Sequence, residues 1–114
     1  MPITPQLDVK FYRSNNGSEP VRDWLRSLHP NERRIIGTDI KTVQYGWPIG
    51  MPLVSHLDKE IWEIRSKLET RISRVLFFTQ PSLIILLHGF IKKQQKTPKQ
   101  DLEIAKKQTK DSKR

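Results

Sequence analysis

The sequence predicts an α+β fold in which one strand and two helices precede three strands and a last helix. Three observations support this order. Apolar residues alternate near the start of the chain, recur every three or four positions over 18–45, and fill strand-like runs within 60–91. A chain of 114 residues is long enough to build one core and too short for two. We therefore expect a single domain over residues 1–114.

The first strand is predicted over 7–13. Its apolar residues Leu7, Val9 and Phe11 stand at alternate positions, which is the period of a strand with one buried face. Residues 14–18 are serine, asparagine and glycine, the residue types of a turn, and they end the strand.

A first helix is expected directly after this turn. Ser18 has the side chain of a helix N-cap, and Pro20 is favoured in a first turn. His29 and Pro30 stop the helix. Its apolar face consists of Val21, Trp24, Leu25 and Leu28.

The second helix is predicted from residue 31 to residue 45 and forms a helical hairpin with the first. Apolar residues keep an approximately helical spacing despite the internal Gly37; they are Ile35, Ile36, Ile40, Val43 and Tyr45. Residues 46–60 are rich in proline and glycine, so we expect them to form an irregular connection within the domain.

Three strand-like runs follow at 60–65, 70–80 and 83–91. Short polar or proline-containing stretches of hairpin length separate them. This arrangement predicts a three-stranded antiparallel meander.

A last helix is expected after the meander. Thr97 has the side chain of an N-cap, and Pro98 suits the first turn. The helix carries few apolar residues among its lysines. Residues 108–114 are expected to be a flexible basic tail of the same domain.

The chain is strongly basic. Its 21 Lys and Arg against 12 Asp and Glu give a net charge of +9 and an isoelectric point near 10.1. Nine of the basic and three of the acidic residues lie within 92–114. Such an excess favours a polyanionic partner, although a solvated lysine-rich tail that maintains solubility explains it equally well.

Features of secreted and membrane proteins are missing from the sequence. It contains no cysteine, which excludes a disulfide framework, a thiol nucleophile and a cysteine zinc site. Its longest apolar run, 83–87, is far shorter than the roughly 20 residues of a spanning helix. The first five residues have neither the basic start nor the apolar centre of a signal peptide. We expect a soluble cytoplasmic protein with no membrane partner.

The sequence gives no support for metal or nucleotide chemistry. The three histidines are far apart, acidic residues do not recur at ligand spacing, and no glycine-rich phosphate loop is present. We therefore expect no cofactor and no bound metal. Cationic side chains remain on and after the predicted strands: Arg65, Arg71, Arg74, His88, Lys92, Lys93 and Lys96. Strand alternation predicts a positively charged sheet face opposite the face that packs on the helices.

Cations of this kind can cleave RNA without a metal. The reaction needs a group that takes the proton from the 2′-OH, positive charge that stabilises the phosphorane, and a group that protonates the leaving 5′-oxygen. Each residue also has a structural alternative. His88 has the surroundings of a hydrogen-bonded core histidine, and Arg65 and Arg74 could pair with Glu63 and Glu69.

Three segments carry a resemblance to a known family: Ile61-Trp-Glu-Ile-Arg65, Ser73-Arg-Val-Leu-Phe77 and Leu86-Leu-His-Gly-Phe-Ile-Lys-Lys-Gln-Gln-Lys-Thr-Pro98. On these segments the chain resembles HigB-type toxins of the RelE/ParE superfamily, in the branch of phage-derived small proteins, from about residue 9 to residue 107. The resemblance implies a RelE-like antiparallel sheet with two N-terminal helices packed on one face and a C-terminal helix, in the order β-α-α-β-β-β-α.

The resemblance also implies a toxin of a type II toxin-antitoxin system. Such a toxin cleaves mRNA in the decoding site of the ribosome and is neutralised by a helix-turn-helix antitoxin of the HigA type. Position by position, Arg65 matches the basic residue that closes the first signature strand, and Arg74 matches the arginine of the next strand. Lys92 and Lys93 match the basic pair after the last strand.

The leading hypothesis is therefore a metal-independent endoribonuclease, or mRNA interferase, in which Arg65 and Arg74 clamp the scissile phosphate. Proton transfer is expected from His88, Lys92, Lys93 or Lys96, and further RNA contacts from Arg71, Lys99, Lys106 and Lys107. Non-enzymatic alternatives stay open: a ParE-like gyrase inhibitor, a basic inhibitor that binds the ribosome or nucleic acid, or a degenerate toxin that only binds its antitoxin.

Overall fold

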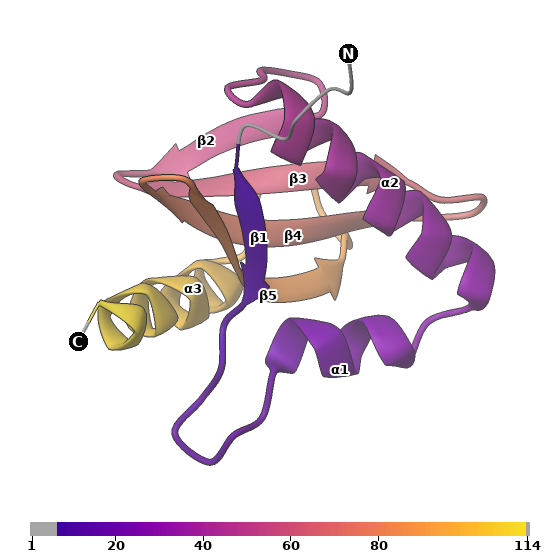
Figure 1. Cartoon of the computed structure of the whole chain (residues 1–114). Helices are drawn as coiled ribbons and strands as arrows, with labels where there is room; N and C mark the ends of the chain where they lie inside the picture. Colours follow the sequence, from indigo (N-terminus) through magenta and orange to yellow (C-terminus); the bar gives the residue numbers. More distant parts are fainter. Residues whose placement is uncertain (1–6, 114) are drawn as a thin grey trace.

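The computed structural model describes residues 7–113, which form three helices and one five-stranded sheet (Figure 1). In chain order the elements are β1 (Asp8–Phe11), α1 (Pro20–Arg26), α2 (Pro30–Gly46), β2 (Val54–Asp58), β3 (Ile61–Lys67), β4 (Ile72–Gln80), β5 (Leu83–Ile91) and α3 (Lys99–Ser112). The α+β class and the order of the elements are those predicted, with β2 as one additional strand. Within this part of the chain, no helix has the length and apolar character needed to cross a membrane.

The sheet has the strand order β1-β5-β4-β3-β2. The neighbours from β2 to β5 are antiparallel, which confirms the predicted meander. β1 instead pairs in parallel with β5, with Asp8 opposite Leu83 and Phe11 opposite Leu86. This edge pair is the parallel exception in a sheet that is otherwise antiparallel, as predicted. A parallel pair needs a long crossover, and the helices and strands between β1 and β5 provide one.

β2 lies within residues 46–60, which we predicted to be irregular. Its Val54 is buried and lies opposite Ile64 of β3. A register shift between His56 and Asp58 interrupts the pairing. The sequence of this segment shows little alternation, and its extended conformation is stabilised by pairing with β3.

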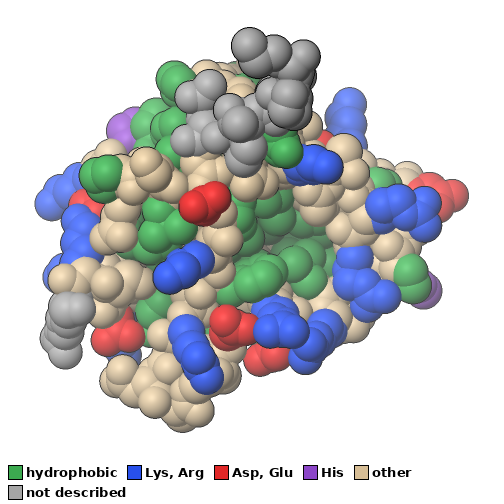
Figure 2. All heavy atoms as spheres, viewed as in Figure 1, with side chains coloured by type: hydrophobic (Ala, Val, Ile, Leu, Met, Phe, Trp, Pro, Cys, Tyr) green, Lys and Arg blue, Asp and Glu red, His purple; other side chains and the backbone are tan. Residues whose placement is uncertain are grey.

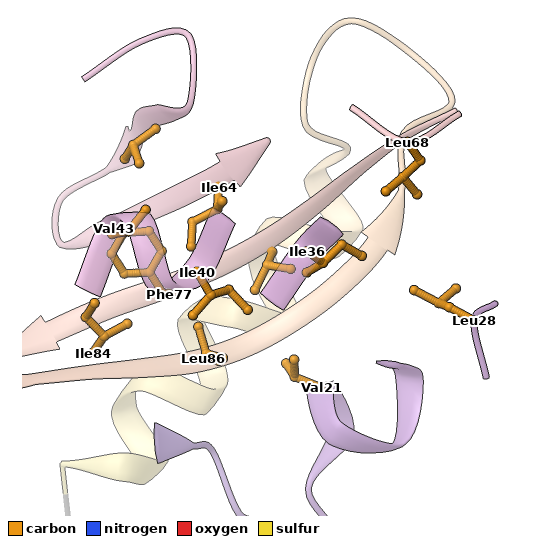
Figure 3. Packing of buried hydrophobic residues seen from close by; sticks show 12 residues of the cluster. Val21, Leu28, Ile36, Ile40, Val43, Ile64, Leu68, Phe77, Ile84 and Leu86 are labelled. Atoms are coloured by element: carbon orange, nitrogen blue, oxygen red, sulfur yellow. The ribbon is translucent and has the colours of Figure 1, made fainter. Parts of the chain in front are cut away.

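Helices cover both faces of the sheet (Figure 1). The larger core lies between the sheet and the first two helices, where Ile36 and Ile40 of α2 pack in one cluster with Phe77 of β4 (Figure 3). Phe78 points to the opposite face and packs with Ala105 of α3. Each such large apolar side chain stabilises the fold by about 1.5–3 kcal/mol when it is buried.

The face opposite the first two helices, which we predicted to be positively charged, is partly covered by α3. Leu76 and Phe78 of β4 and Leu87 of β5 point to this side and are fully buried. Leaving this apolar surface in water would cost free energy. Leu102 and Ala105 of α3 cover it instead.

α1 packs against β5 at a glycine. A Cβ atom at Gly89 would overlap the indole ring of Trp24 on α1. The side chains of the neighbouring residues His88 and Phe90 lie on the opposite face of the sheet, which packs on α3. Gly89 therefore allows α1 to approach the sheet closely without disturbing the residues that face α3.

Residues 108–112 continue α3 and do not form the predicted flexible tail. Thr109 is buried, and its hydroxyl donates a hydrogen bond to the carbonyl of Ala105. The hydroxyl of Tyr12 donates a 2.5 Å hydrogen bond to Asp111 and fixes the last turn of the helix. Residue 114 of the predicted tail lies outside the described residues.

Candidate functional site

The predicted cations of the central strands share one face of the sheet. Arg65 of β3 lies directly opposite Arg74 of β4, and Arg74 lies directly opposite Phe90 of β5. Residues opposite each other on neighbouring strands have their side chains on the same face. His88 lies opposite Leu76, whose side chain packs on the α3 side. The whole set therefore faces the α3 side.

Arg74 is buried in a polar network. Its side chain is 3% exposed. Its Nε lies 3.5 Å from Oε1 of Glu63, its Nη1 donates a 3.0 Å hydrogen bond to the hydroxyl of Thr97, and its Nη2 donates a 2.6 Å hydrogen bond to the carbonyl of Gln95. The Thr97 hydroxyl donates a 2.6 Å hydrogen bond to Glu63. The pairing of Arg74 with Glu63, one of the alternatives open from the sequence, is thus present.

We call Glu63, Arg74, Thr97 and the carbonyl of Gln95 the clasp. Residues 92–98, the basic loop, run from β5 to α3 and supply its last two members. Thr97, predicted as a helix cap, makes its side-chain hydrogen bonds within the clasp, and Pro98 occupies the cap position of α3.

The basic loop begins as an extension of β5. The N–H of Lys92 donates a 2.7 Å hydrogen bond to the carbonyl of Ile72, so strand pairing continues for one further residue. The amine of Lys92 donates a 3.3 Å hydrogen bond to the Gln95 side chain. Lys93 and Lys96 are exposed and form no hydrogen bond or ion pair within residues 7–113. The loop therefore presents three amines at the end of the sheet that also carries Arg65.

Arg65 is the partly exposed arginine of this face. Its side chain has no hydrogen bond or ion pair among the described residues, and the alternative pairing with Glu69 does not form. Arg65 lines a hollow of about 320 Å³ together with Asp39, Leu53 and Lys67. Its guanidinium is therefore free to bind an anion.

His88 is paired with an acid that sequence reasoning missed. Its Nε2 lies 2.6 Å from Oδ1 of Asp101 on α3, and each side chain is a little under one-fifth exposed. The Phe90 ring stacks beside the imidazole with centroids 5.5 Å apart. An acid in the first turn of a helix is ordinarily explained by the helix dipole, so the sequence held no signal that Asp101 reaches β5.

Two of the four residues predicted to make further RNA contacts are held in ion pairs. Arg71 donates hydrogen bonds of 2.8 and 2.9 Å to Glu32 of α2, and these lower the pKa of the Glu32 carboxyl. Lys106 lies 2.9 Å from Asp58, where the hydrogen bond raises the pKa of Lys106 and lowers that of Asp58. The other two, Lys99 and Lys107, are exposed on α3.

Comparison with protein families identifies a match over residues 23–110 to the family described as phage derived protein Gp49-like (DUF891). The chain belongs to the Gp49-like family. The match includes most of α1 and α3 and all elements between them. Comparison with curated proteins gave no match.

The Gp49-like family is a RelE/HigB-like, toxin-type family associated with toxin-antitoxin systems. Its toxin character implies an antitoxin as partner. The matched region contains Arg65, the clasp and His88 with Asp101. The candidate site therefore lies wholly within the family region.

Two grooves of this Gp49-like chain are lined by lysines of α3 and not by Arg65, Arg74, His88 or any residue of the basic loop. A groove of about 740 Å³ is lined by Tyr12, Lys107 and Asp111, and one of about 650 Å³ by Asp58 and Lys106 among others. In the view of Figure 2, basic and acidic side chains border an apolar hollow. No group of three or more metal-ligating side chains occurs within residues 7–113. Strand register, and not surface shape or total charge, defines the candidate site.

Proposed function

We propose that this chain is the toxin of a type II toxin-antitoxin system and cleaves mRNA on the ribosome, in the cytoplasm. One observation carries the proposal. Arg65 and His88 come from separate strands yet lie on the same face of the sheet, and the basic loop with its three amines continues β5 from that face. Membership of a toxin-type family supports the same conclusion.

The proposed reaction uses the 2′-OH of the RNA as nucleophile. A base takes the proton from this hydroxyl, its oxygen attacks the phosphorus, and the bond from phosphorus to the 5′-oxygen breaks as that oxygen receives a proton. Arg65 and the lysines of the basic loop stabilise the negative charge of the phosphorane. The products are a 2′,3′-cyclic phosphate and a 5′-hydroxyl.

His88 is the proton-transfer group that the geometry favours. Asp101 accepts a hydrogen bond from its Nε2 and leaves Nδ1 of the neutral ring as an acceptor. A histidine oriented by a carboxylate is a frequent general base. Lys92, Lys93 and Lys96 remain the alternative proton donors and acceptors, with Lys99 and Lys107 as RNA contacts on the neighbouring helix.

In this proposal Arg74 does not clamp the scissile phosphate, which is the role that we predicted for it from the sequence. Its guanidinium is already bonded to Thr97 and Gln95 and lies beside Glu63. Arg65 is thus the arginine available to the phosphate.

The proposed partners are the ribosome carrying mRNA and a HigA-like helix-turn-helix antitoxin. An antitoxin that binds tightly should relieve growth inhibition on co-expression and co-elute with the toxin as one species. A toxin that stays free in the presence of the candidate antitoxin would contradict this pairing.

The decisive experiment adds metal-stripped toxin to preassembled ribosome-mRNA complexes and maps the RNA ends by primer extension. Cleavage should persist, with a cyclic phosphate or 3′-phosphate facing a 5′-hydroxyl. Arg65→Gln should reduce the rate roughly 100-fold, the cost of removing one transition-state donor. The matched control is Arg34→Gln, which changes an exposed arginine of α2.

Two outcomes would refute the proposal. A 5′-phosphate on the downstream fragment would mean that water was the nucleophile. Intact mRNA together with DNA damage in cells would instead identify a gyrase inhibitor of the ParE type.

A further inference from the structure

A buried charged cluster lies beneath the basic loop, and the proposed chemistry does not use it. The clasp joins β3, β4 and the loop, and its two charged members, Glu63 and Arg74, are each 3% exposed. Burying an ion pair costs free energy that only complete hydrogen bonding offsets. Two apolar residues would fill the same space without this cost, so the value of the clasp lies in the orientation that it imposes.

The guanidinium of Arg74 directs its nitrogens to three different places. Nε faces Glu63, Nη1 bonds the Thr97 hydroxyl, and Nη2 bonds the Gln95 carbonyl. Two of these partners belong to the basic loop. The planar fork of arginine fixes these directions relative to one another, which the single amine of a lysine cannot do. The loop is thereby fixed in position over β4.

We propose that the clasp holds the basic loop in the position from which Lys92, Lys93 and Lys96 meet RNA, and that Arg74 is a positioning residue that does not touch the phosphate. The part of this inference that concerns RNA rests on the proposed function. The part that concerns the position of the loop does not depend on RNA binding. Thr97 and Gln95 cover the guanidinium, so a phosphate oxygen reaches it only if the loop moves.

Trypsin tests the inference directly because it cuts after the lysines of the loop. Thr97→Val keeps the shape of the side chain and removes the hydroxyl that joins Arg74 to Glu63. The change removes two hydrogen bonds to charged groups. Cleavage within 92–98 should therefore become at least roughly tenfold faster, the factor expected for one of them. The kcat for RNA cleavage should fall by a similar factor, while KM changes less because the lysines remain.

Two matched variants separate this effect from a general loss of structure. Thr97→Ser retains the hydroxyl and should restore both the slow proteolysis and the kcat of the wild-type chain. Thr79→Val makes the same chemical change on β4, outside the clasp, and should leave both quantities unchanged.

Arg74 requires a paired substitution. Replacing it alone leaves the Glu63 carboxylate buried beside an empty place and can unfold the chain. The variant Glu63→Leu/Arg74→Met replaces both charges with apolar groups of similar size. It should fold, expose the loop to trypsin and lose as much kcat as Thr97→Val. Adding Thr97→Val to it should cause no further loss, because the members act as one unit.

The inference is overturned if the loop stays protected in Thr97→Val and in the paired variant. It is also overturned if the paired variant loses cleavage while the loop remains protected, since a direct phosphate contact behaves in that way. If the wild-type chain cleaves no RNA, the proposed function fails, and the proteolysis rates alone decide whether the clasp holds the loop.

Discussion

Asp101 of α3 holds the imidazole of His88 on β5 through a 2.6 Å contact between its Oδ1 and His88 Nε2. An ionised carboxylate only accepts hydrogen bonds, so Nε2 of the neutral ring carries the proton. Phe90 stacks on the same imidazole and restricts its rotation. The pair thus fixes both the orientation and the tautomer of the one histidine on the candidate face.

Substitution of either partner should reduce RNA cleavage without unfolding the protein. We expect a loss of roughly 100-fold or more for His88→Gln, the usual contribution of a positioned acid or base. Asp101→Asn should cost at least roughly tenfold, because the amide also donates a hydrogen bond and favours the wrong tautomer. Single-turnover cleavage of ribosome-bound mRNA measures both values.

The matched control for Asp101 is Glu103→Gln. Glu103 is exposed on the same helix and contacts Lys106, one turn along. Its neutralisation should leave the cleavage rate within about twofold, as for surface changes away from a site. Equal losses in the two variants would indicate a general charge effect on α3 and remove the role given to Asp101.

The ion pair between Glu32 and Arg71 should make stability depend on pH in the acid range. The hydrogen bonds from Arg71 hold the pKa of Glu32 in the folded chain below its ordinary value of 4.5. The stabilisation is therefore complete above that value and is lost as the pH falls through the lowered pKa. Thermal unfolding should show the wild type more stable than Glu32→Gln at neutral pH, with the difference shrinking in acid.

Glu69→Gln serves as the control for this experiment. Glu69 is exposed and forms no ion pair within residues 7–113. Its substitution should change the unfolding temperature little at any pH. A difference between wild type and Glu32→Gln that stays constant into acid would show that Arg71 does not favour the charged carboxylate.

The phenol of Tyr12 should ionise only at high pH. Its hydrogen bond to Asp111, with burial and the charge of that carboxylate, raises the pKa of the phenol from 10.0 to about 12. The contribution to stability is complete below pH 10.0 and is lost as the pH rises through about 12. In a Tyr45→Phe background, tyrosinate absorbance reports Tyr12 alone and should appear near the raised pKa. Titration at the ordinary value would show that the link to α3 is not formed.

Gly89→Ala should destabilise the fold by about 1–3 kcal/mol, the usual cost of overpacking. The added methyl overlaps the Trp24 ring, so Trp24→Leu should recover part of the loss in the double variant. Gly37→Ala provides the control, since nothing lies near its added methyl group. On the helical propensity scale it should instead stabilise by about 0.5–1 kcal/mol. Urea unfolding distinguishes these opposite signs.

Much of the fold could be predicted because helix and strand periods are local. The apolar spacing of 18–45 and the runs within 60–91 correspond to α1, α2 and β3 to β5. β2 could not be predicted, since only Val54 of its residues is fully buried and its pairing comes from β3. The parallel pairing of β1 depends on where the helices bring the chain, which no local pattern records.

Part of the candidate site could likewise be predicted from the sequence, and part could not. Strand alternation places Arg65 and Arg74 on one face once the meander is known. His88 joins them only because the register of β5 against β4 shifts between Leu86 and His88, and the sequence does not reveal this bulge. The burial of Arg74 depends on Thr97, which returns over the sheet to bond Glu63, 34 residues away in the chain. Such contacts follow from the path of a loop in three dimensions and leave no periodic signal.

The parallel pair of β1 with β5 has a consequence for synthesis. Of the five strands, β1 is made before the others, yet its partner residues Leu83–Leu86 are made only after two helices and three strands. Each hairpin of the meander can close between neighbouring segments, whereas β1 must wait with its backbone groups unpaired. We expect the amides of β1 to gain protection after those of β3 and β4 in pulse-labelled refolding. The first strand in the chain would then be the last to enter the sheet.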